Sequence, residues 1–252
     1  MRTVNKRVAI VTGGASGIGF AFAQGLAQAG YALVIADIRD SENAAAKLRE
    51  IGYDAIGVAV DVTSTDDTMA MATRATEAFG RIDVLINNAG LFTTLTLKPF
   101  EQIDAHEWMK VMQVNTLGPF LCAKAVMPMF RGAGSGRIIN IASTSPIKGT
   151  PNMQHYTASK GAVIAFTRSL ARELGSLNVT VNAIAPGFTL SDGVLASGMD
   201  AVMGEAARRT SRSIQRDQLP SDLVGTAIFL ASESASFITG QTIAVDGGAV
   251  FL

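Results

Sequence analysis

A tyrosine and a lysine stand four residues apart, at Tyr156 and Lys160, in a segment whose pattern predicts a helix. On a helix, side chains at i and i+4 lie on one face, one turn apart. A free phenol has a pKa near ~10 and accepts protons poorly at neutral pH, whereas a nearby ammonium favours the phenolate and lowers that pKa. The pair could therefore act as a general acid and base, although many surface helices carry this spacing by accident.

The elements that must position this pair are predicted from short apolar runs that alternate with longer alanine-rich segments. Buried strands are predicted at 8–11, 32–36, 55–60, 84–86, 137–141, 179–184 and 242–245. Helices are predicted at 19–29, 41–51, 66–79, 105–130, 156–174 and 221–231, and 187–220 is expected to be irregular. This alternation indicates right-handed crossovers between parallel strands. We therefore predict an α/β fold, with residues 1–252 forming a single doubly wound, Rossmann-type domain whose seven-stranded parallel sheet carries helices on both faces.

Composition argues against several other classes of protein. The chain has 252 residues, 48% of them hydrophobic, and its basic and acidic side chains balance at 21 each, so no net charge favours nucleic acid or an anionic membrane. Two histidines and one cysteine show no metal-site spacing, and Cys122 stands in an apolar run that predicts a core position. Residues 1–6 lack the features of a signal peptide, and no apolar run is long enough to span a membrane. We expect a soluble, cytoplasmic protein.

A glycine-rich turn follows the first predicted strand and runs Thr-Gly-Gly-Ala-Ser-Gly-Ile-Gly from Thr12 to Gly19. Gly13, Gly17 and Gly19 let the backbone turn tightly and let a dinucleotide pyrophosphate approach the free amides of the next helix. The spacing differs from the general dinucleotide fingerprint, so an ordinary glycine-rich turn is the alternative. Because the turn joins the first strand to the first helix, we favour nucleotide binding.

An acidic residue, Asp37, ends the second predicted strand, eighteen residues beyond Gly19. A carboxylate there can accept hydrogen bonds from the adenosine ribose hydroxyls and would repel a 2′-phosphate. Ser16 and Ile38 carry no charge that would attract this phosphate, and Arg39, which could reach it, fits a solvated surface position better. NAD is therefore predicted as the cofactor in preference to NADP.

Polar residues also follow the third and fourth predicted strands. Asp61 and Val62 come after the third strand, and Asn87-Asn-Ala-Gly90 comes after the fourth. The carboxyl ends of parallel strands form the edge at which such sheets bind ligands. Asp61 could instead cap the next helix, or it could contact the adenine amine, and Asn87 could be a turn residue.

Taken together, these residues resemble the short-chain dehydrogenase/reductase family over essentially the whole chain. The glycine turn, Asp61, the Asn-Asn-Ala-Gly turn, Asn115, Ser143, the Tyr156–Lys160 pair and Pro186-Gly187 stand in the family's order. Each piece is weak or moderate alone, but coincidence is an implausible explanation for all seven in register. The resemblance implies an oxidoreductase that uses a nicotinamide cofactor and acts on a CH-OH group.

The resemblance also implies a catalytic tetrad of Asn115, Ser143, Tyr156 and Lys160. Tyr156 would take the alcohol proton as hydride leaves the carbon, or return it in the reverse direction. Ser143 would hold the substrate oxygen and stabilise its alkoxide character. Lys160 would lower the pKa of the tyrosine and bind the nicotinamide ribose. Asn115 would hold a water that links Lys160 to solvent; a helix kink without chemistry is the alternative, because Asn competes with the helical backbone.

The same resemblance places Pro186, Gly187 and Thr189 beside the nicotinamide carboxamide. The full predicted set of cofactor contacts is Gly13, Ser16, Gly17, Ile18, Gly19, Asp37, Asp61, Val62, Asn88, Ala89, Gly90, Tyr156, Lys160, Pro186, Gly187 and Thr189.

Substrate contacts are expected from 91–94, 144–155 and an insertion at 188–219, which would act as a lid. The candidates for the pocket wall beside Ser143 are mostly apolar, which favours a hydrophobic or aromatic alcohol or ketone; they are Phe92, Ile147, Met153, Phe188 and Leu190. The lid's apolar side is predicted at Val194, Leu195, Met199 and Met203. Two short pieces, 149–153 and 191–194, resemble pyridoxal 4-dehydrogenases of the same family, which is a hint about the substrate.

Charged residues near these segments have two possible roles. Arg208, Arg212 and Arg216 fall at helical spacing, with Arg209 adjacent, and could recognise an acidic substrate group. Runs of charge are usually solvated, so a solvated or subunit-facing surface is favoured. His155 adjoins Tyr156 and is expected to face away from the substrate, because neighbouring helix residues point about 100° apart.

Three functions remain open at this point. The leading one is an NAD-dependent dehydrogenase of a small, largely apolar or aromatic alcohol or ketone. One alternative is an NADPH-dependent 3-oxoacyl-thioester reductase, against which Asp37 argues; the other is a non-catalytic NAD-binding sensor, which would not need the tetrad. The resemblance further implies a homotetramer packed through helix 156–174, with no nucleic-acid or membrane partner.

Overall fold

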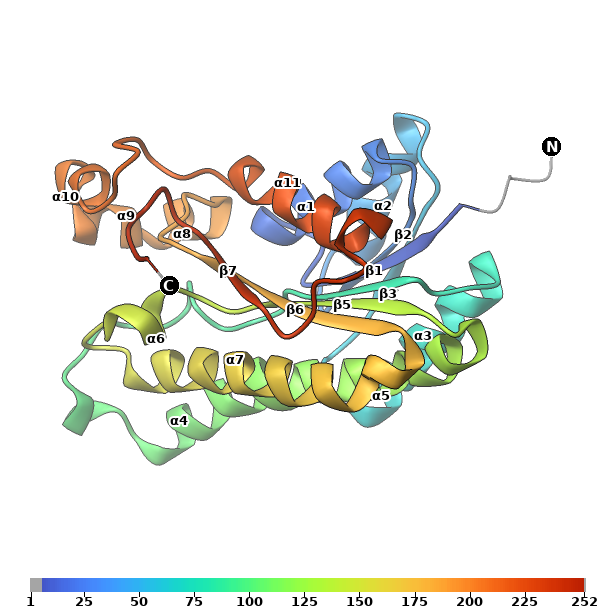
Figure 1. The fold of residues 1–252 in the computed structure, drawn as a ribbon. Coiled ribbons are helices and arrows are strands. Elements are labelled where there is room, and N and C mark those ends of the chain that lie inside the picture. Colours follow the sequence, from blue (N-terminus) through green and yellow to red (C-terminus); the bar gives the residue numbers. More distant parts are fainter. Residues whose placement is uncertain (1–5, 252) are drawn as a thin grey trace.

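Seven strands form one parallel sheet in the computed structural model of the protein, which describes residues 6–251 (Figure 1). The sheet order is β3-β2-β1-β4-β5-β6-β7. The strands are β1 Val8–Thr12, β2 Ala32–Asp37, β3 Ala55–Ala59, β4 Val84–Asn87, β5 Gly136–Ile141, β6 Val179–Pro186 and β7 Thr242–Val245. Each predicted strand ends within two residues of these bounds, and the doubly wound, Rossmann-type fold is confirmed.

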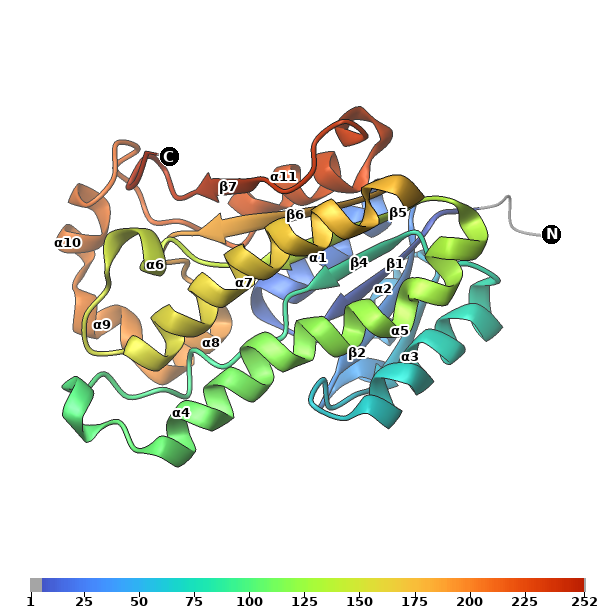
Figure 2. The same ribbon diagram turned by 60° about the horizontal axis from the view of Figure 1, so that its bottom comes forward.

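Helices cover both faces of the sheet, as the two views in Figures 1 and 2 show. One face carries α1 Gly17–Gln28, α2 Ser41–Glu50 and α11 Ser221–Ala231, and the other carries α3 Thr65–Phe79, α5 Gly118–Ala133 and α7 Gln154–Leu174. Successive strand side chains point to opposite faces, so Ala9 and Val11 join one apolar layer while Val8 and Ile10 join the other. Burial on both sides explains why the strands are continuous apolar runs.

The sheet reverses its winding between β1 and β4, which are neighbours. The chain leaves β1 for α1 on one face and, after β4, reaches α5 on the other. A crevice therefore opens at the carboxyl ends of these two strands, the position at which doubly wound sheets bind ligands.

The predicted helix at 105–130 is divided in three. It consists of α4 Ala105–Met112, a π-helical turn at Gln113–Leu117 and α5. A π-helical turn holds an extra residue, so helical periodicity alone did not predict it. Asn115 lies inside this turn, so the helix is widened at this residue.

The stretch predicted to be irregular, 187–220, contains three short helices. These are α8 Asp192–Ser197, α9 Met199–Met203 and α10 Glu205–Thr210, separated by Gly198 and Gly204 with φ of 70° and 69°. Helices this short give too few turns for a periodic pattern. With α6 Ser145–Lys148, they gather at one end of the sheet (left in Figure 1). Short 3₁₀ turns occupy Phe100–Gln102, Gly175–Leu177 and Glu233–Ala235.

Two sequence expectations concern the rest of the chain. Cys122 is buried as predicted, and burial raises the pKa of its thiol to about 12. Across residues 6–251, no helix combines the length and apolar character needed to cross a bilayer. The predicted lack of a signal peptide rests mainly on residues 1–5, which lie outside the described part, and the cytoplasmic location stays a prediction.

Candidate active site

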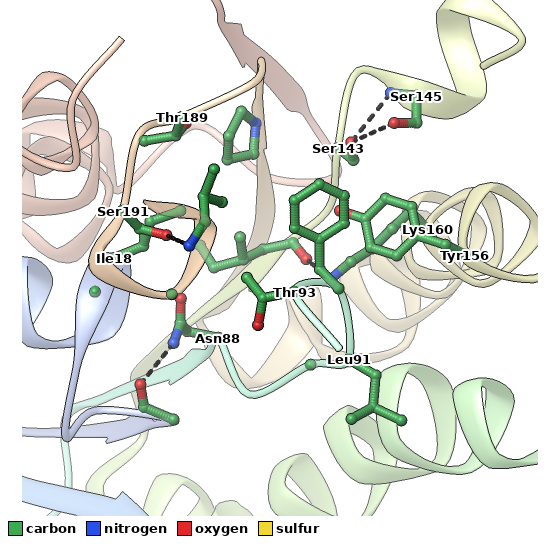
Figure 3. Close-up of a pocket in the computed structure, with 18 of the residues that line it drawn as sticks. Ile18, Asn88, Leu91, Thr93, Ser143, Ser145, Tyr156, Lys160, Thr189 and Ser191 are labelled. Carbon is green, nitrogen blue, oxygen red and sulfur yellow. Dashed lines mark hydrogen bonds between the residues drawn. The ribbon is translucent and has the colours of Figure 1, made fainter. Parts of the chain in front are cut away.

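A cavity of about 690 Å³ opens in the crevice between the ends of β1 and β4. Every residue of the predicted cofactor set lines it, and so do Ser143, Phe92, Met153 and Phe188. Ser143, Tyr156 and Lys160 lie on one side of the cavity in Figure 3, across from Ile18 and Ser191. The cavity therefore brings the candidate cofactor and substrate residues into one continuous space.

The glycine turn after β1 has a backbone that other residues would strain. Gly13 and Gly17 have φ of 60° and 53°, in the left-handed region that favours glycine. A Cβ atom at Gly19 would lie 2.0 Å from the carbonyl oxygen of Gly13. The first amides of α1 consequently face the cavity without intervening side chains, as an anion at a helix N-terminus requires.

Thr12 and Asn88 join the ends of β1 and β4. The Asn88 Nδ2 donates to the carbonyl oxygens of Thr12 and Gly13, each at 3.0 Å. The backbone amides of Asn88 and Ala89 donate to the Thr12 Oγ1 at 3.0 and 3.1 Å. These four hydrogen bonds fix the two sides of the crevice relative to each other.

Asp37 and Asp61 lie at the wall predicted to hold the adenosine. The Asp37 Oδ2 accepts a hydrogen bond from the Ala15 amide at 3.0 Å, which ties the carboxylate to the glycine turn and leaves acceptor positions free. The Asp61 Oδ1 accepts from the amide and hydroxyl of Thr63 at 2.9 and 2.7 Å. Helix α3 is capped by Ser64, so the alternative that Asp61 caps this helix is wrong.

The candidate catalytic side chains are buried at the end of β5 and the start of α7. Lys160 Nζ donates to the carbonyl oxygen of Ile141 at 2.7 Å and lies 5.9 Å from the centre of the Tyr156 ring. Ser143 Oγ donates to Ser145 Oγ at 3.0 Å and accepts from the Ser145 amide at 3.1 Å (Figure 3). The end of β5, the start of α7 and the turn of α6 thus hold the side chains of Ser143, Tyr156 and Lys160 close together.

The pKa values at this site differ from the expectation based on the ammonium alone. Burial raises the pKa of Tyr156 to about 12, and a hydrogen bond with Ser143 acts in the opposite direction but is the smaller cause. Burial lowers the pKa of Lys160 to about 8. The predicted lowering of the Tyr156 pKa is therefore wrong for the protein without cofactor. The prediction considered the charge of Lys160 but not the desolvation of the buried phenol.

Asn115 lies behind the residues that line the cavity and contacts some of them. Its Oδ1 accepts from the Leu91 amide at 2.7 Å, and its Nδ2 donates to Ser159 Oγ at 3.0 Å. A Cβ atom on Gly90 would lie 3.2 Å from the Asn115 Oδ1 and 3.5 Å from the Lys160 Nζ, so these two groups flank the same glycine. Asn115 is fully buried and is not among the described residues that line the cavity.

The substrate end is mostly apolar. The rings of Phe92 and Tyr156 have centres 4.9 Å apart, and those of Phe92 and Phe188 are 6.4 Å apart. The described residues that line the cavity do not include Ile147 or Leu190, so a role of these two residues in the pocket wall stays a prediction. Neighbouring residues on a helical turn point in different directions, and Lys148, not Ile147, faces the cavity from α6.

The 188–219 segment closes the cavity on the side of the glycine turn. A Cβ atom on Gly17 would lie 3.4 Å from the Cβ of Ser191, and one on Gly193 would lie 3.3 Å from Thr93 Cγ2. Val194, Met199 and Met203 line the cavity as predicted for an apolar inner side, whereas Leu195 is 52% exposed. Ser191, Gly193 and Thr93 lie in segments expected to contact the substrate, but no individual role was predicted for any of them, because small side chains give no periodic signal.

The arginines of this segment are not the solvated or subunit-facing surface that was favoured. Arg208 and Arg212 are each 6% exposed. Arg209 and Arg216 face solvent, where Arg209 pairs with Glu205 and Asp217 and Arg216 pairs with Asp222. Arg208 Nε donates to Asp217 Oδ1 at 3.0 Å, and Arg212 Nη2 donates to the carbonyl oxygen of Phe188 at 3.2 Å. Helix α10 ends at Thr210, so the helical stripe assumed from the spacing does not exist.

His155 faces away from the cavity, as predicted. It is fully buried, and its Nε2 lies 3.3 Å from Oε1 of Glu107, whose Oε2 pairs with Lys98. This contact joins α7 to α4. Among the described residues, no group of three or more His, Cys, Asp or Glu side chains could hold a metal ion.

Known proteins resemble this chain along nearly its whole length. The family described as Enoyl-(acyl carrier protein) reductase matches residues 13–250. A cis-4-hydroxycyclohexanecarboxylate dehydrogenase of Sinomonas cyclohexanicum is 38% identical over 96% of both chains, and a 3-oxoacyl-(acyl-carrier-protein) reductase of Synechocystis is 39% identical over 99% of both. The crystal structure of a suspected gluconate dehydrogenase from Agrobacterium tumefaciens has a TM-score of 0.90 at 32% identity, covering 98% of this chain and 97% of that one. The chain therefore belongs to the short-chain dehydrogenase/reductase family of oxidoreductases.

Proposed function

We propose that the protein is an NAD-dependent dehydrogenase that transfers a hydride between the nicotinamide and a small, largely apolar or aromatic alcohol or ketone. The observation that carries this proposal is the position of Ser143, Tyr156 and Lys160 in the same cavity as the glycine turn and Asp37. Such an arrangement lets a dinucleotide bound along the crevice present its nicotinamide to a proton donor and acceptor.

Residues on both sides of the switch point would hold the cofactor. The amides after Gly17 would bind the pyrophosphate, Asp37 the adenosine ribose, Asp61 the adenine amine, Lys160 the nicotinamide ribose and Thr189 the carboxamide. When bound, the cofactor supplies the hydride acceptor or donor, and the protein supplies geometry and electrostatics.

In the oxidative direction, Tyr156 accepts the proton of the substrate hydroxyl while Ser143 donates a hydrogen bond to the same oxygen. Burial raises the pKa of Tyr156, and the hydrogen bond with Ser143 opposes this shift; the cationic oxidised nicotinamide would favour the phenolate further. Asn115, which flanks Gly90 together with Lys160, would hold a water through which the proton reaches solvent. Reduction runs through the same groups in reverse.

Asp37 supports NAD over NADP. Its carboxylate lines the cavity at the end of β2, and a 2′-phosphate at this place would face a like charge. We expect NADH to bind at least about ten-fold more tightly than NADPH, and Asp37→Ser to remove most of this preference. Titration of both cofactors by their fluorescence measures it, and tighter binding of NADPH by the wild type would overturn the assignment.

A 3-oxoacyl-thioester reductase is the main competing activity, because relatives with that name are 36–39% identical to the chain. Reduction of acetoacetyl-coenzyme A with NADPH tests it directly. The non-catalytic sensor is the other alternative, and it is favoured if the protein binds NAD but oxidises no alcohol in a broad panel. The buried tetrad argues against the sensor, because binding alone does not need these residues.

The substrate proposal rests on Phe92, Phe188 and Met153, which give the cavity broad apolar walls. A relative named for the oxidation of a hydroxylated six-membered ring is consistent with walls of this kind. A screen of cyclic, aryl, aliphatic and hydroxymethyl-pyridine alcohols, with NAD and NADP side by side, identifies the class. We further propose that 188–219 acts as a lid over the bound substrate.

We also propose a homotetramer. Met109 and Leu117 are 54% and 39% exposed beside α7, and Phe120, 47% exposed, stacks edge-on against Phe166 of α7. Apolar side chains of this size on neighbouring helices are typical of a subunit interface. Sedimentation velocity measures the assembly, and Phe120→Glu should reduce its size.

A further inference from the structure

Lys148 adds a positive charge to the lining of the cavity, on a residue that is also exposed to solvent. Among the described residues, four charged side chains line this cavity: Asp37, Asp61, Lys148 and Lys160. The two carboxylates lie at the adenosine wall, and Lys160 is engaged beside Tyr156. Lys148 is thus the one charge among the described residues that faces the substrate space without a role in the proposed chemistry.

The backbone holds Lys148 close to the reacting group. Lys148 ends α6, the single helical turn that begins two residues after Ser143, and its amide donates to the carbonyl oxygen of Thr144 at 3.0 Å. Ser143 and Ser145 are hydrogen-bonded to each other at the start of this turn. Ser143 and Lys148 therefore line the same cavity and are linked by a single helical turn.

The ammonium of Lys148 makes no hydrogen bond or ion pair with any residue that the structure describes. Burial lowers the pKa of this lysine, the charge of Asp246 opposes this shift and the charge of Arg212 adds to it. The Asp246 Oδ1 is already occupied by the amides of Gly248 and Ala249. The Asp246 Oδ2 is buried and has no hydrogen-bond partner among the described residues, but Asp246 and Arg212 do not line the cavity, where the ammonium of Lys148 is a free donor.

We propose that Lys148 binds a carboxylate on the substrate, at the end remote from the hydroxyl, so that the enzyme acts on small apolar hydroxy acids and the matching keto acids. A carboxylate carries one negative charge, which a single ammonium balances, whereas a phosphate dianion requires more donors than this apolar end offers. The buried arginines of the 188–219 segment are engaged elsewhere and do not compete for this group. The inference deepens the proposed function and depends on it for the reaction.

A binding experiment tests Lys148 without requiring turnover. Calorimetry on the NAD-saturated enzyme compares cyclohexanecarboxylate with its neutral amide in the wild type, Lys148→Met, Lys148→Arg and, as control, Lys47→Met on the outer helix α2. We expect about ten-fold tighter binding of the acid by the wild type, no preference in Lys148→Met, and a retained preference in Lys148→Arg and Lys47→Met. An equal preference in the wild type and Lys148→Met would overturn the proposal.

Kinetics separate this inference from the proposed function. With a cyclic hydroxy acid and its methyl ester, Lys148→Met should raise the KM for the acid about ten-fold, change kcat by less than about two-fold, and leave the ester unaffected. If the ester is oxidised and the variant treats the acid as the wild type does, the carboxylate site is wrong and the dehydrogenase stands. If no alcohol is oxidised with NAD, the proposed function fails while the binding comparison still decides the role of Lys148.

Discussion

The cofactor end and the substrate end of the cavity differ in how far backbone and side-chain groups form them. At the cofactor end, four hydrogen bonds from Asn88 and Ala89 and the left-handed backbone conformation of Gly13 fix the course of the main chain. At the substrate end, the loop after β6 and the short helices that follow it present side chains such as Phe188 and Met199 to the cavity. The comparison teaches that cofactor recognition depends on the course of the main chain, whereas substrate recognition depends on side chains that can be exchanged without altering the sheet.

The substrate end is nevertheless anchored. Arg208 pairs with Asp217, and Arg212 holds the carbonyl oxygen of Phe188, both inside the 188–219 segment. Arg208 lowers the pKa of Asp217, so this pair stays ionised. These contacts hold the base of the segment, while its inner surface makes only apolar and van der Waals contacts with the cavity.

The largest effect on activity is expected at Tyr156, where the cofactor and substrate ends of the cavity meet. Tyr156→Phe removes the hydroxyl that exchanges the substrate proton, so kcat should fall by about 10³-fold. Binding of NADH should stay within about two-fold, because the phenyl ring keeps its contact with Phe92. Steady-state rates and NADH fluorescence measure both quantities, and a variant with a tenth of the wild-type rate would remove Tyr156 from the proton step.

A methyl group in the glycine turn should weaken cofactor binding without disturbing the substrate end of the cavity. In Gly19→Ala the new Cβ would lie 2.0 Å from Gly13 O and 2.5 Å from Asn88 Nδ2, so the turn must shift and NADH should bind about ten- to a hundred-fold more weakly. Gly132→Ala, which meets no atom within 4 Å on α5, is the matched control and should be neutral or slightly stabilising. Equal NADH affinities in the two variants would contradict the rigid role given to this turn.

Substitution of the buried Arg212 should alter the substrate end of the cavity. Arg212→Met leaves the Phe188 carbonyl oxygen without its donor, so the free energy of unfolding should fall by about 1–3 kcal/mol and the substrate KM should rise several-fold. The NADH affinity should stay unchanged, because no described contact of Arg212 reaches the glycine turn. The exposed Arg216→Met should change stability by less than about 0.5 kcal/mol in the same denaturant titrations. Similar losses in both variants would show that burial of Arg212 is unimportant.

The smallest effect is a pH dependence of stability at the shared catalytic wall. Burial lowers the pKa of Lys160 to about 8 from 10.5, so between these values the unfolded chain binds more protons and stability rises with pH. The gain between pH 8 and pH 9 should be about 1 kcal/mol in the wild type relative to Lys160→Met, whose side chain does not titrate. A constant difference between the two proteins over this range would mean that Lys160 is hydrated in solution.

The cofactor end could be predicted from the sequence almost completely. Strand ends lie where apolar runs stop, so residues such as Asp37 and Asn88 could be placed at one edge from topology alone. What could not be predicted depends on side-chain packing over long separations. The burial of Arg208 and Arg212, the inward position of Lys148 and the π-helical turn around Asn115 all depend on tertiary contacts that no local spacing encodes.

The pKa of Tyr156 illustrates the same limit in electrostatic terms. The spacing of Tyr156 and Lys160 correctly places the ammonium near the ring, at 5.9 Å from its centre. The degree of burial follows from Phe92, which comes from a loop more than sixty residues earlier and covers the phenol. The desolvation that dominates the pKa was therefore outside the reach of the local pattern.

The contact of Ser191 with Gly17 has a consequence for the order of events in turnover. Ser191 also caps α8 by accepting a hydrogen bond from the Val194 amide, so the first turn of the 188–219 segment rests on the pyrophosphate turn. If this segment acts as the proposed lid, its closing would cover a dinucleotide bound at that turn. The enzyme should therefore bind the dinucleotide first and release it last. In product-inhibition kinetics, NADH should then compete with NAD⁺ for the free enzyme, whereas the ketone should compete neither with NAD⁺ nor with the alcohol.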